Sequence, residues 1–141
     1  ILQIIVHTYR DLSNYRARSY TNTLELHASN PLAYKICNYI DTNLTDIKKL
    51  SDVSQALGYS YAYLSKIFSQ SMNLSIKDYY TQRRFETAAK MLAQDFTIAR
   101  ISQVLHFSDD SSFCKAFKKY YHTTPAKYRE LLSSSSDRLS I

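Results

Sequence analysis

Residues 106–129 have the sequence HFSDDSSFCKAFKKYYHTTPAKYR, and this stretch decides the fold. Phe113 and Phe117 lie four positions apart, which places both side chains on one face of a helix. Thr124 and Pro125 are suited to begin the next helix, because threonine caps helix N-termini and proline is favoured at the first helical position. The stretch therefore predicts one helix, a tight turn and the start of another helix.

The same pattern occurs earlier in the chain. Residues 50–60 match residues 98–108 at an offset of 48 positions, one residue is then inserted, and residues 64–79 match residues 113–128 at an offset of 49. The matched positions share their chemistry: Leu50 with Ile98, Val53 with Ile101, Ser54 with Ser102, Leu57 with Leu105, Tyr59 with Phe107, Leu64 with Phe113, Lys66 with Lys115 and Phe68 with Phe117. So many ordered agreements indicate two copies of one small unit.

Each copy is predicted to contain a short helix, at residues 49–57 or 98–105, followed by a turn and a second, capped helix. Gly58 suits the left-handed backbone conformation at a helix C-terminus, and His106 is among the residue types that tolerate it. Ser60 and Ser108 follow as predicted N-caps. This order is that of a helix-turn-helix. A plain helical hairpin would fit one copy, but it accounts less well for two copies that share turn and cap.

The rest of the sequence predicts an all-α chain. A long helix at residues 76–92 joins the two units, and its 17 residues at ~1.5 Å each span roughly 25 Å. Ser75 and Asp78 form a capping box at its start. The predicted divisions are an N-terminal helix at 1–18, a linker at 19–29, a domain at 30–132 with helix-turn-helix units at about 47–68 and 97–119, and a flexible tail at 133–141.

The composition limits the classes of function. The chain of 141 residues has 18 Lys and Arg against 12 Asp and Glu, and this net charge of +6 favours a polyanionic partner. A single glycine argues against a glycine-rich phosphate loop, and no apolar run approaches the roughly 20 residues of a membrane span. The scattered histidines and two distant cysteines form no metal-ligand pattern, so we expect no metal, no cofactor and no catalytic site.

The two units together resemble the DNA-binding domain of the AraC/XylS family of bacterial transcription regulators. The resemblance covers about residues 30–132 and rests on the signature G-F-x-x-x-S-x-F-x-x-x-F-K-x-x-x-G-x-[ST]-P-x-x-Y-R, which residues 106–129 follow. The chain departs from the family at turn glycines, where it has Asn73, His106 and His122. These residue types visit the left-handed region more readily than most, so the fold should survive.

The resemblance implies a sequence-specific regulator that inserts two recognition helices into adjacent major-groove segments of double-stranded DNA. It implies action in the cytoplasm, at the nucleoid, with RNA polymerase as a partner of the parent protein. Residues 1–18 are expected to be the tail of a regulatory domain or a dimerisation helix, which allows a homodimer through this segment or through a missing domain.

Helical spacing and the resemblance together predict the base-reading residues, which face outward from the second helix of each unit. They are Tyr61, Ala62, Ser65 and Lys66 in the first unit, and Asp110, Ser111, Ser112, Cys114 and Lys115 in the second. Lysine can donate to guanine, aspartate can accept from cytosine, and apolar groups can contact thymine methyls. Two alternatives stay open: each lysine is a solvated surface charge, and Asp109 with Asp110 caps a helix without touching a base.

A second set is predicted to bind phosphate: Ser60, Arg83, Arg84, Lys118, Lys119 and Lys127. Either arginine could instead pair with Glu86 or Asp52. Cys114, beside Lys115, is a candidate for a thiol with a lowered pKa, with an ordinary cysteine as the alternative. The remaining tyrosines of note are expected at the edge of the core: Tyr59, Tyr63, Tyr79, Tyr80 and Tyr128.

Two other classes of function compete with DNA binding. The first is a helical protein–protein module whose basic face serves solubility, and the second is an enzyme that modifies DNA. A salt titration separates the first, because affinity for DNA falls steeply with salt. Product formation from duplex DNA would reveal the second.

Overall fold

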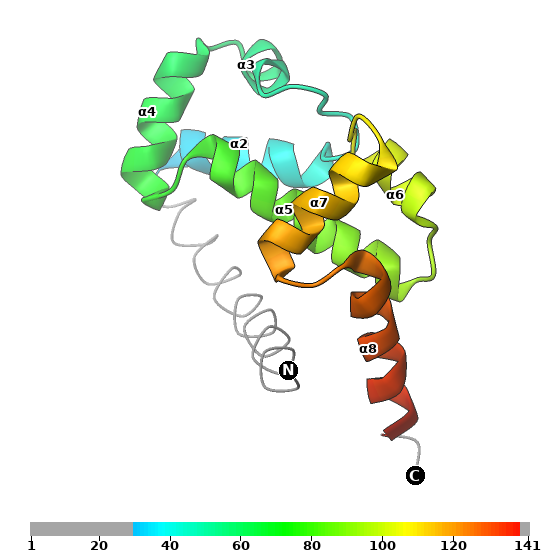
Figure 1. The fold of residues 1–141 in the computed structure, drawn as a ribbon. Helices are drawn as coiled ribbons and strands as arrows, with labels where there is room; N and C mark the ends of the chain where they lie inside the picture. The colour runs from blue at the N-terminus through cyan, green and yellow to red at the C-terminus, as the bar shows by residue number, and fades with distance from the viewer. Residues whose placement is uncertain (1–29, 139–141) are drawn as a thin grey trace.

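The structure, a computed structural model, describes residues 30–138, which form seven α-helices and no strand. Figure 1 shows the helices gathered in two groups along α5. The helices are α2 (Pro31–Thr42), α3 (Ser51–Leu57), α4 (Tyr61–Met72), α5 (Ile76–Ala93), α6 (Ile98–Val104), α7 (Asp110–Tyr121) and α8 (Pro125–Arg138). The all-α prediction is confirmed for this part of the chain. The predicted helix at 1–18, the linker at 19–29 and residues 139–141 lie outside the described residues.

Each helix-turn-helix unit has its own hydrophobic core, and α5 contributes to both. The first core gathers side chains of α2, α3, α4 and the beginning of α5, and the second gathers those of α5, α6, α7 and α8. The division falls inside α5, where Tyr80 belongs to the first core and Phe85 to the second. The helix that joins the units is therefore also a wall of each unit.

Side-chain caps fix the starts of four helices where the sequence predicted them. In each case a side-chain oxygen accepts a hydrogen bond from the backbone amide three residues later, and the caps are Asn30, Ser60, Ser75 and Thr124. The Ser75 hydroxyl also donates to the Asp78 carboxylate at 2.6 Å. This pair confirms the predicted link between Ser75 and Asp78 at the start of α5.

The start of α7 agrees with the alternative that the sequence left open for Asp109 as a helix cap, and not with the prediction for Ser108. Asp109, not Ser108, is the N-cap, and its carboxylate accepts from the Ser112 amide at 2.6 Å. The Ser108 hydroxyl instead donates to the Ser112 hydroxyl at 2.9 Å. The residue inserted between the two copies explains the shift, because it lengthens the second turn by one position and places a carboxylate at the cap.

The turns use left-handed backbone where the sequence predicted it. Gly58, Asn73, His106 and His122 have φ values of 75°, 51°, 55° and 59°. The three residues that replace glycines of the family signature thus adopt the conformation that those glycines would adopt. Asp95, between α5 and α6, also has a positive φ of 60°, which the sequence analysis did not predict.

Two helix boundaries correct the prediction. Helix α3 begins at Ser51 rather than at residue 49, because the Asp52 carboxylate accepts from the Lys48 and Lys49 amides and holds the preceding loop. Helix α8 continues to Arg138 rather than ending at residue 132, so residues 133–138 are not the predicted flexible tail. The hydroxyl groups of the first two serines donate to carbonyls four residues earlier and so fit the helix.

Candidate nucleic-acid interface

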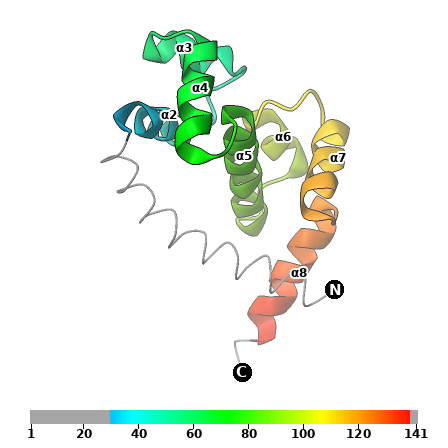
Figure 2. The same ribbon diagram turned by 90° about the vertical axis from the view of Figure 1, so that its left-hand side faces the viewer.

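Helices α4 and α7 are the second helices of the two units and correspond to recognition helices. Each is anchored by two fully buried side chains, Leu64 and Phe68 in α4 and Phe113 and Phe117 in α7. Figures 1 and 2 show both helices running downward from their N-terminal ends, with α7 beginning lower than α4, and Figure 2 shows α5 between them. The N-terminal ends of both recognition helices therefore point toward the upper side of the molecule in these views.

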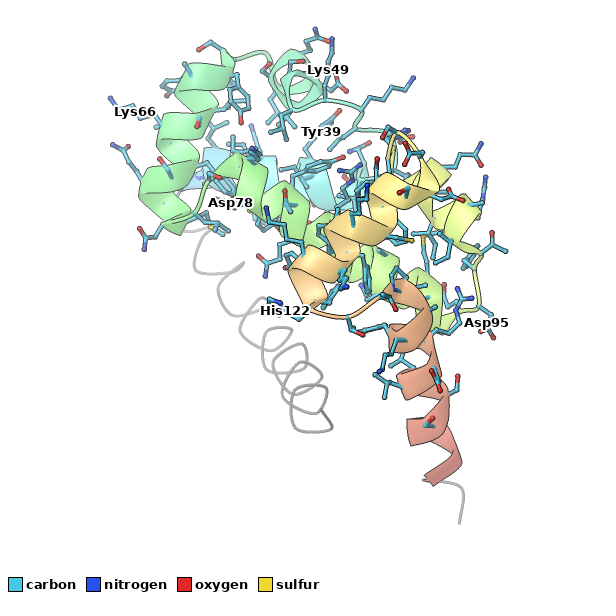
Figure 3. All side chains as sticks on the ribbon, viewed as in Figure 1. Tyr39, Lys49, Lys66, Asp78, Asp95 and His122 are labelled. Atoms are coloured by element: carbon cyan, nitrogen blue, oxygen red, sulfur yellow. The ribbon has the colours of Figure 1, made fainter. Side chains whose placement is uncertain are left out.

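The outward face of α4 carries the residues predicted to read bases in the first unit. Tyr61, Ala62 and Lys66 are exposed, and Ser65 is half-buried. Figure 3 shows Lys66 projecting from the outer side of α4, away from the rest of the domain. Ala62 and Lys66 lie on the side of α4 opposite the buried anchors, and Tyr61 is exposed in the first turn of the helix.

The outward face of α7 is more acidic and carries smaller side chains. Asp110, Ser111 and Lys115 are exposed, whereas Ser112 and Cys114 are half-buried. Ser112 is held by Asp109 and Ser108, so it helps to cap the helix and is less free to contact a base. Hydrogen bonds from Ser112 lower the pKa of Asp109, which keeps the cap ionised at neutral pH.

Two tyrosines beside α4 were placed incorrectly by the sequence analysis. Tyr59 and Tyr63 are 48% and 47% exposed and stack on each other with ring centroids 5.6 Å apart, whereas they were expected at the edge of the core. Tyr79, Tyr80 and Tyr128 are buried. Their place in the sequence indicated this exposure, because both residues lie next to the Ser60 cap, at the end of α4 that the core does not cover. The start of α4 therefore presents the stacked pair of Tyr59 and Tyr63 together with the exposed ring of Tyr61.

Cys114 is not the activated thiol that its neighbour Lys115 suggested. Burial raises the pKa of Cys114, and the Asp110 carboxylate on the preceding turn raises it further. Burial also raises the pKa of Cys37, in α2, to about 11. Both cysteines are free, and both are weak nucleophiles at neutral pH.

We expect a disulfide reagent to modify Cys114 more slowly than it modifies glutathione at pH 8, because only the thiolate reacts. Peptide mass spectrometry after timed quenching would measure the two cysteines separately. In the denatured chain both thiols should react at ordinary rates, which serves as the control. Modification of Cys114 in the folded chain faster than glutathione would contradict the raised pKa.

The predicted phosphate-binding residues divide into two groups. Lys118, Lys119 and Lys127 are exposed, the first two in the last turns of α7 and the third in α8. Ser60 is also exposed, and its hydroxyl already accepts from the Tyr63 amide as the cap of α4. The ammonium groups of the three lysines are therefore accessible to a polyanion.

Arg83 does not fit the predicted role in phosphate binding. Its guanidinium is 2.7 Å from Asp41 in α2 and 2.7 Å from Glu86 in its own helix. The Tyr79 hydroxyl donates to the same Asp41 carboxylate. Burial alone would lower the pKa of Arg83, but Asp41, with Tyr79 and Glu86, raises it. The alternative of an internal ion pair with Glu86 is therefore correct for Arg83, with Asp41 as a second partner that the sequence did not indicate.

Arg84 is also used inside the protein. Its Nε donates to the Leu105 carbonyl at 2.7 Å, and its guanidinium carbon lies 3.7 Å from the centroid of the Phe107 ring. Burial lowers the pKa of Arg84. Arg84 pairs with neither predicted alternative, Glu86 or Asp52, because its contacts are with a carbonyl and an aromatic ring of the second turn. Both arginines of α5 therefore have partners inside the protein, and the candidate interface consists of the exposed residues of the two recognition helices and the three exposed lysines.

Solved structures with this arrangement are bacterial regulators. The chain is similar to the C-terminal domain of the two-component response regulator yesN from Fusobacterium nucleatum, with 34% identity and a TM-score of 0.61 over 67% of this chain and 93% of that domain. A regulator from Chromobacterium violaceum, described as having an AraC-type DNA-binding domain, shares the fold with a TM-score of 0.66 at 22% identity over 74% of this chain and 95% of that one. Residues 53–131, more than half of the chain, match the family described as "Helix-turn-helix domain". The chain belongs to the AraC-type helix-turn-helix family.

Membership of the AraC-type family makes the matched residues 53–131 part of a DNA-binding domain of the kind found in transcription regulators. The regulatory protein PocR of Salmonella typhimurium is 34% identical over 103 residues, which are 72% of this chain and 34% of PocR. The chain thus spans about a third of the length of this relative. Within residues 30–138, every helix falls short of the length and apolar character of a membrane span. The same residues bring no three metal-ligating side chains together.

Proposed function

We propose that this AraC-type domain recognises specific sequences in double-stranded DNA by placing α4 and α7 in adjacent segments of the major groove. The observation that carries the proposal is the pair of recognition helices, each anchored by buried side chains and free at its N-terminal end. The major groove admits one α-helix, and recognition helices contact bases through their N-terminal residues.

The two helices offer different chemistry to the bases. Helix α4 and the turn before it present three exposed tyrosine rings and Lys66, which suit thymine methyl groups and guanine acceptors respectively. Helix α7 presents Asp110 and Lys115, which suit a cytosine amine and a guanine. We therefore expect two half-sites of different sequence rather than a palindrome. Ser111 and Ala62 add a permissive hydroxyl and a small apolar contact.

Phosphate contacts supply most of the affinity that depends on salt and orient the domain on the duplex. Lys118, Lys119 and Lys127 are the exposed cations assigned to this role. They lie in the second unit, so we place more of the backbone contacts on the half-site read by α7.

Removing Lys118 or Lys119 is expected to reduce the slope of log affinity against log salt by about one for each alanine substitution. Fluorescence anisotropy with a labelled duplex at several salt concentrations would measure the slope. Lys90→Ala is the matched control, because Lys90 is an exposed lysine near the end of α5, outside the recognition helices. An unchanged slope for both variants would remove these lysines from the interface.

The parent protein is proposed to be a bacterial transcription regulator that acts in the cytoplasm, at the nucleoid, and contacts RNA polymerase. We further propose that it dimerises through residues 1–18 or through a region outside this chain. PocR is called a regulatory protein, and a relative from Streptococcus mutans, 39% identical over 88 residues, is called the Msm operon regulatory protein. These names support regulation of transcription.

The test is selection of bound duplexes from a random pool, followed by salt titrations with a selected and a scrambled duplex. We expect the selected duplex to bind about 10³-fold or more tightly, with affinity falling as salt rises. Equal affinity for both duplexes, or affinity that does not change with salt, would refute the proposal and favour a protein–protein module.

A further inference from the structure

The two helix-turn-helix units are joined by more than α5. Each unit has its own core and α5 packs in both, so contacts outside the cores add to α5 in fixing how the units sit relative to each other. Two side chains make such contacts, Arg84 in α5 and His106 in the turn before α7. Both reach the same place, where the second turn approaches the loop between α2 and α3.

Arg84 links the second turn to the first core. Its Nε donates to the Leu105 carbonyl at 2.7 Å, and its guanidinium carbon lies 3.7 Å from the Phe107 ring centroid and 5.8 Å from that of Tyr80. The Tyr80 hydroxyl donates to the Ile47 carbonyl at 3.1 Å, in the loop between α2 and α3. The guanidinium therefore lies between an aromatic ring of the first core and the turn of the second unit.

His106 closes the connection from the other side. Its Nε2 lies 2.6 Å from the Thr45 carbonyl, which belongs to the same loop as Ile47. A carbonyl only accepts, so Nε2 must carry the proton and donate. The contacts between the units thus form a closed ring. It runs from the loop between α2 and α3 through Tyr80 and Arg84 to the second turn, and His106 in that turn contacts the loop again.

His106 has a positive φ of 55°, which glycine adopts with less strain. A glycine at this position would keep the turn, but it could not reach Thr45. The histidine side chain therefore adds a contact with the first unit that the conformation of the turn does not require.

We infer that Arg84 and His106 are positioning residues that hold the two recognition helices at one separation and so set the spacing between DNA half-sites. The inference rests on the proposed function. One added base pair moves a half-site by ~3.4 Å and rotates it by roughly 35°, since a turn of DNA has about 10.5 base pairs. A rigid pair of helices cannot follow that change, whereas a hinged pair can.

The experiment uses the whole chain and the selected duplex, with the spacing between half-sites changed by one base pair in either direction. We expect each change to weaken wild-type binding about tenfold, comparable to the loss of one base contact. We expect His106→Gly and Arg84→Ala to reduce this penalty to about threefold or less, with unchanged affinity for a duplex that contains a single half-site. Arg100→Ala is the control and should keep the wild-type penalty, since Arg100 is exposed on α6 and its guanidinium donates to Gln103 on the same helix.

The two variants test the connection between the units independently, so either one gives a result if the other folds poorly. Arg84→Ala removes a half-buried side chain, so circular dichroism would check its fold, while His106→Gly relieves strain in the turn. A spacing penalty in His106→Gly equal to that of the wild type would overturn the inference for His106, and the same result in folded Arg84→Ala would overturn it for Arg84. Specific wild-type binding that tolerates altered spacing would overturn it altogether. Failure of the wild type to prefer the selected duplex over a scrambled one would instead refute the proposed function.

Discussion

Replacing Phe117 by alanine is expected to lower the free energy of unfolding by about 3–5 kcal/mol, the usual cost of removing a buried phenylalanine from a core. The side chain is fully buried and lies at the centre of an aromatic cluster formed by Phe85, Phe113, Tyr121 and Tyr128. Domains of this size are stable by only about 5–15 kcal/mol, so the loss should be evident in urea unfolding followed by circular dichroism. Binding to the α7 half-site should weaken as the second unit opens.

Phe96→Ala is the matched control for this prediction. Phe96 is 39% exposed in the connection between α5 and α6, and surface substitutions usually change stability by about 0.5 kcal/mol or less. We therefore expect an unfolding curve close to that of the wild type. Equal losses in the two variants would contradict the separate aromatic core of the second unit.

Replacing Lys66 by alanine is expected to weaken binding by about 1–3 kcal/mol and to relax base preference in one half-site only. The side chain is exposed on the outer face of α4, and its ammonium can donate to guanine acceptors. Competition between the selected duplex and duplexes with single base changes would measure both effects.

Lys77→Ala controls for the loss of one positive charge, because Lys77 is exposed in the first turn of α5 and outside the recognition helices. We expect little change in its base preference. Equal weakening of all sequences by Lys66→Ala would move Lys66 from the base-reading to the phosphate-binding residues.

Local features of the fold could be predicted well because each depends on a few neighbouring residues. Ser60 and Ser75 cap helices because a serine hydroxyl just before a helical segment can accept a hydrogen bond from an otherwise unpaired backbone amide of the first turn. Asn73 and His122 adopt positive φ because the repeat places them where the chain must turn. The cap of α7 could not be decided from the sequence, because Ser108 and Asp109 are both good caps and only the length of the turn decides between them.

The candidate site could be predicted less completely because the missing information is tertiary. Helical spacing indicates the directions in which the side chains of Arg83 and Arg84 extend from α5. It does not indicate that Asp41 and the Leu105 carbonyl, far away in sequence, will lie within hydrogen-bond distance of them. The exposure of Tyr59 and Tyr63 likewise depends on where the core ends. The outward positions on α4 and α7 were predictable, since they follow directly from the buried anchors of the same helices.

Hydroxyl-radical footprinting on the selected duplex tests most directly whether both units bind DNA together. The account predicts two protected segments on one face of the duplex, with centres about 10 base pairs apart, and loss of only one segment when Lys66 is replaced. A single protected segment with the wild-type chain, or protection spread evenly along the duplex, would contradict it.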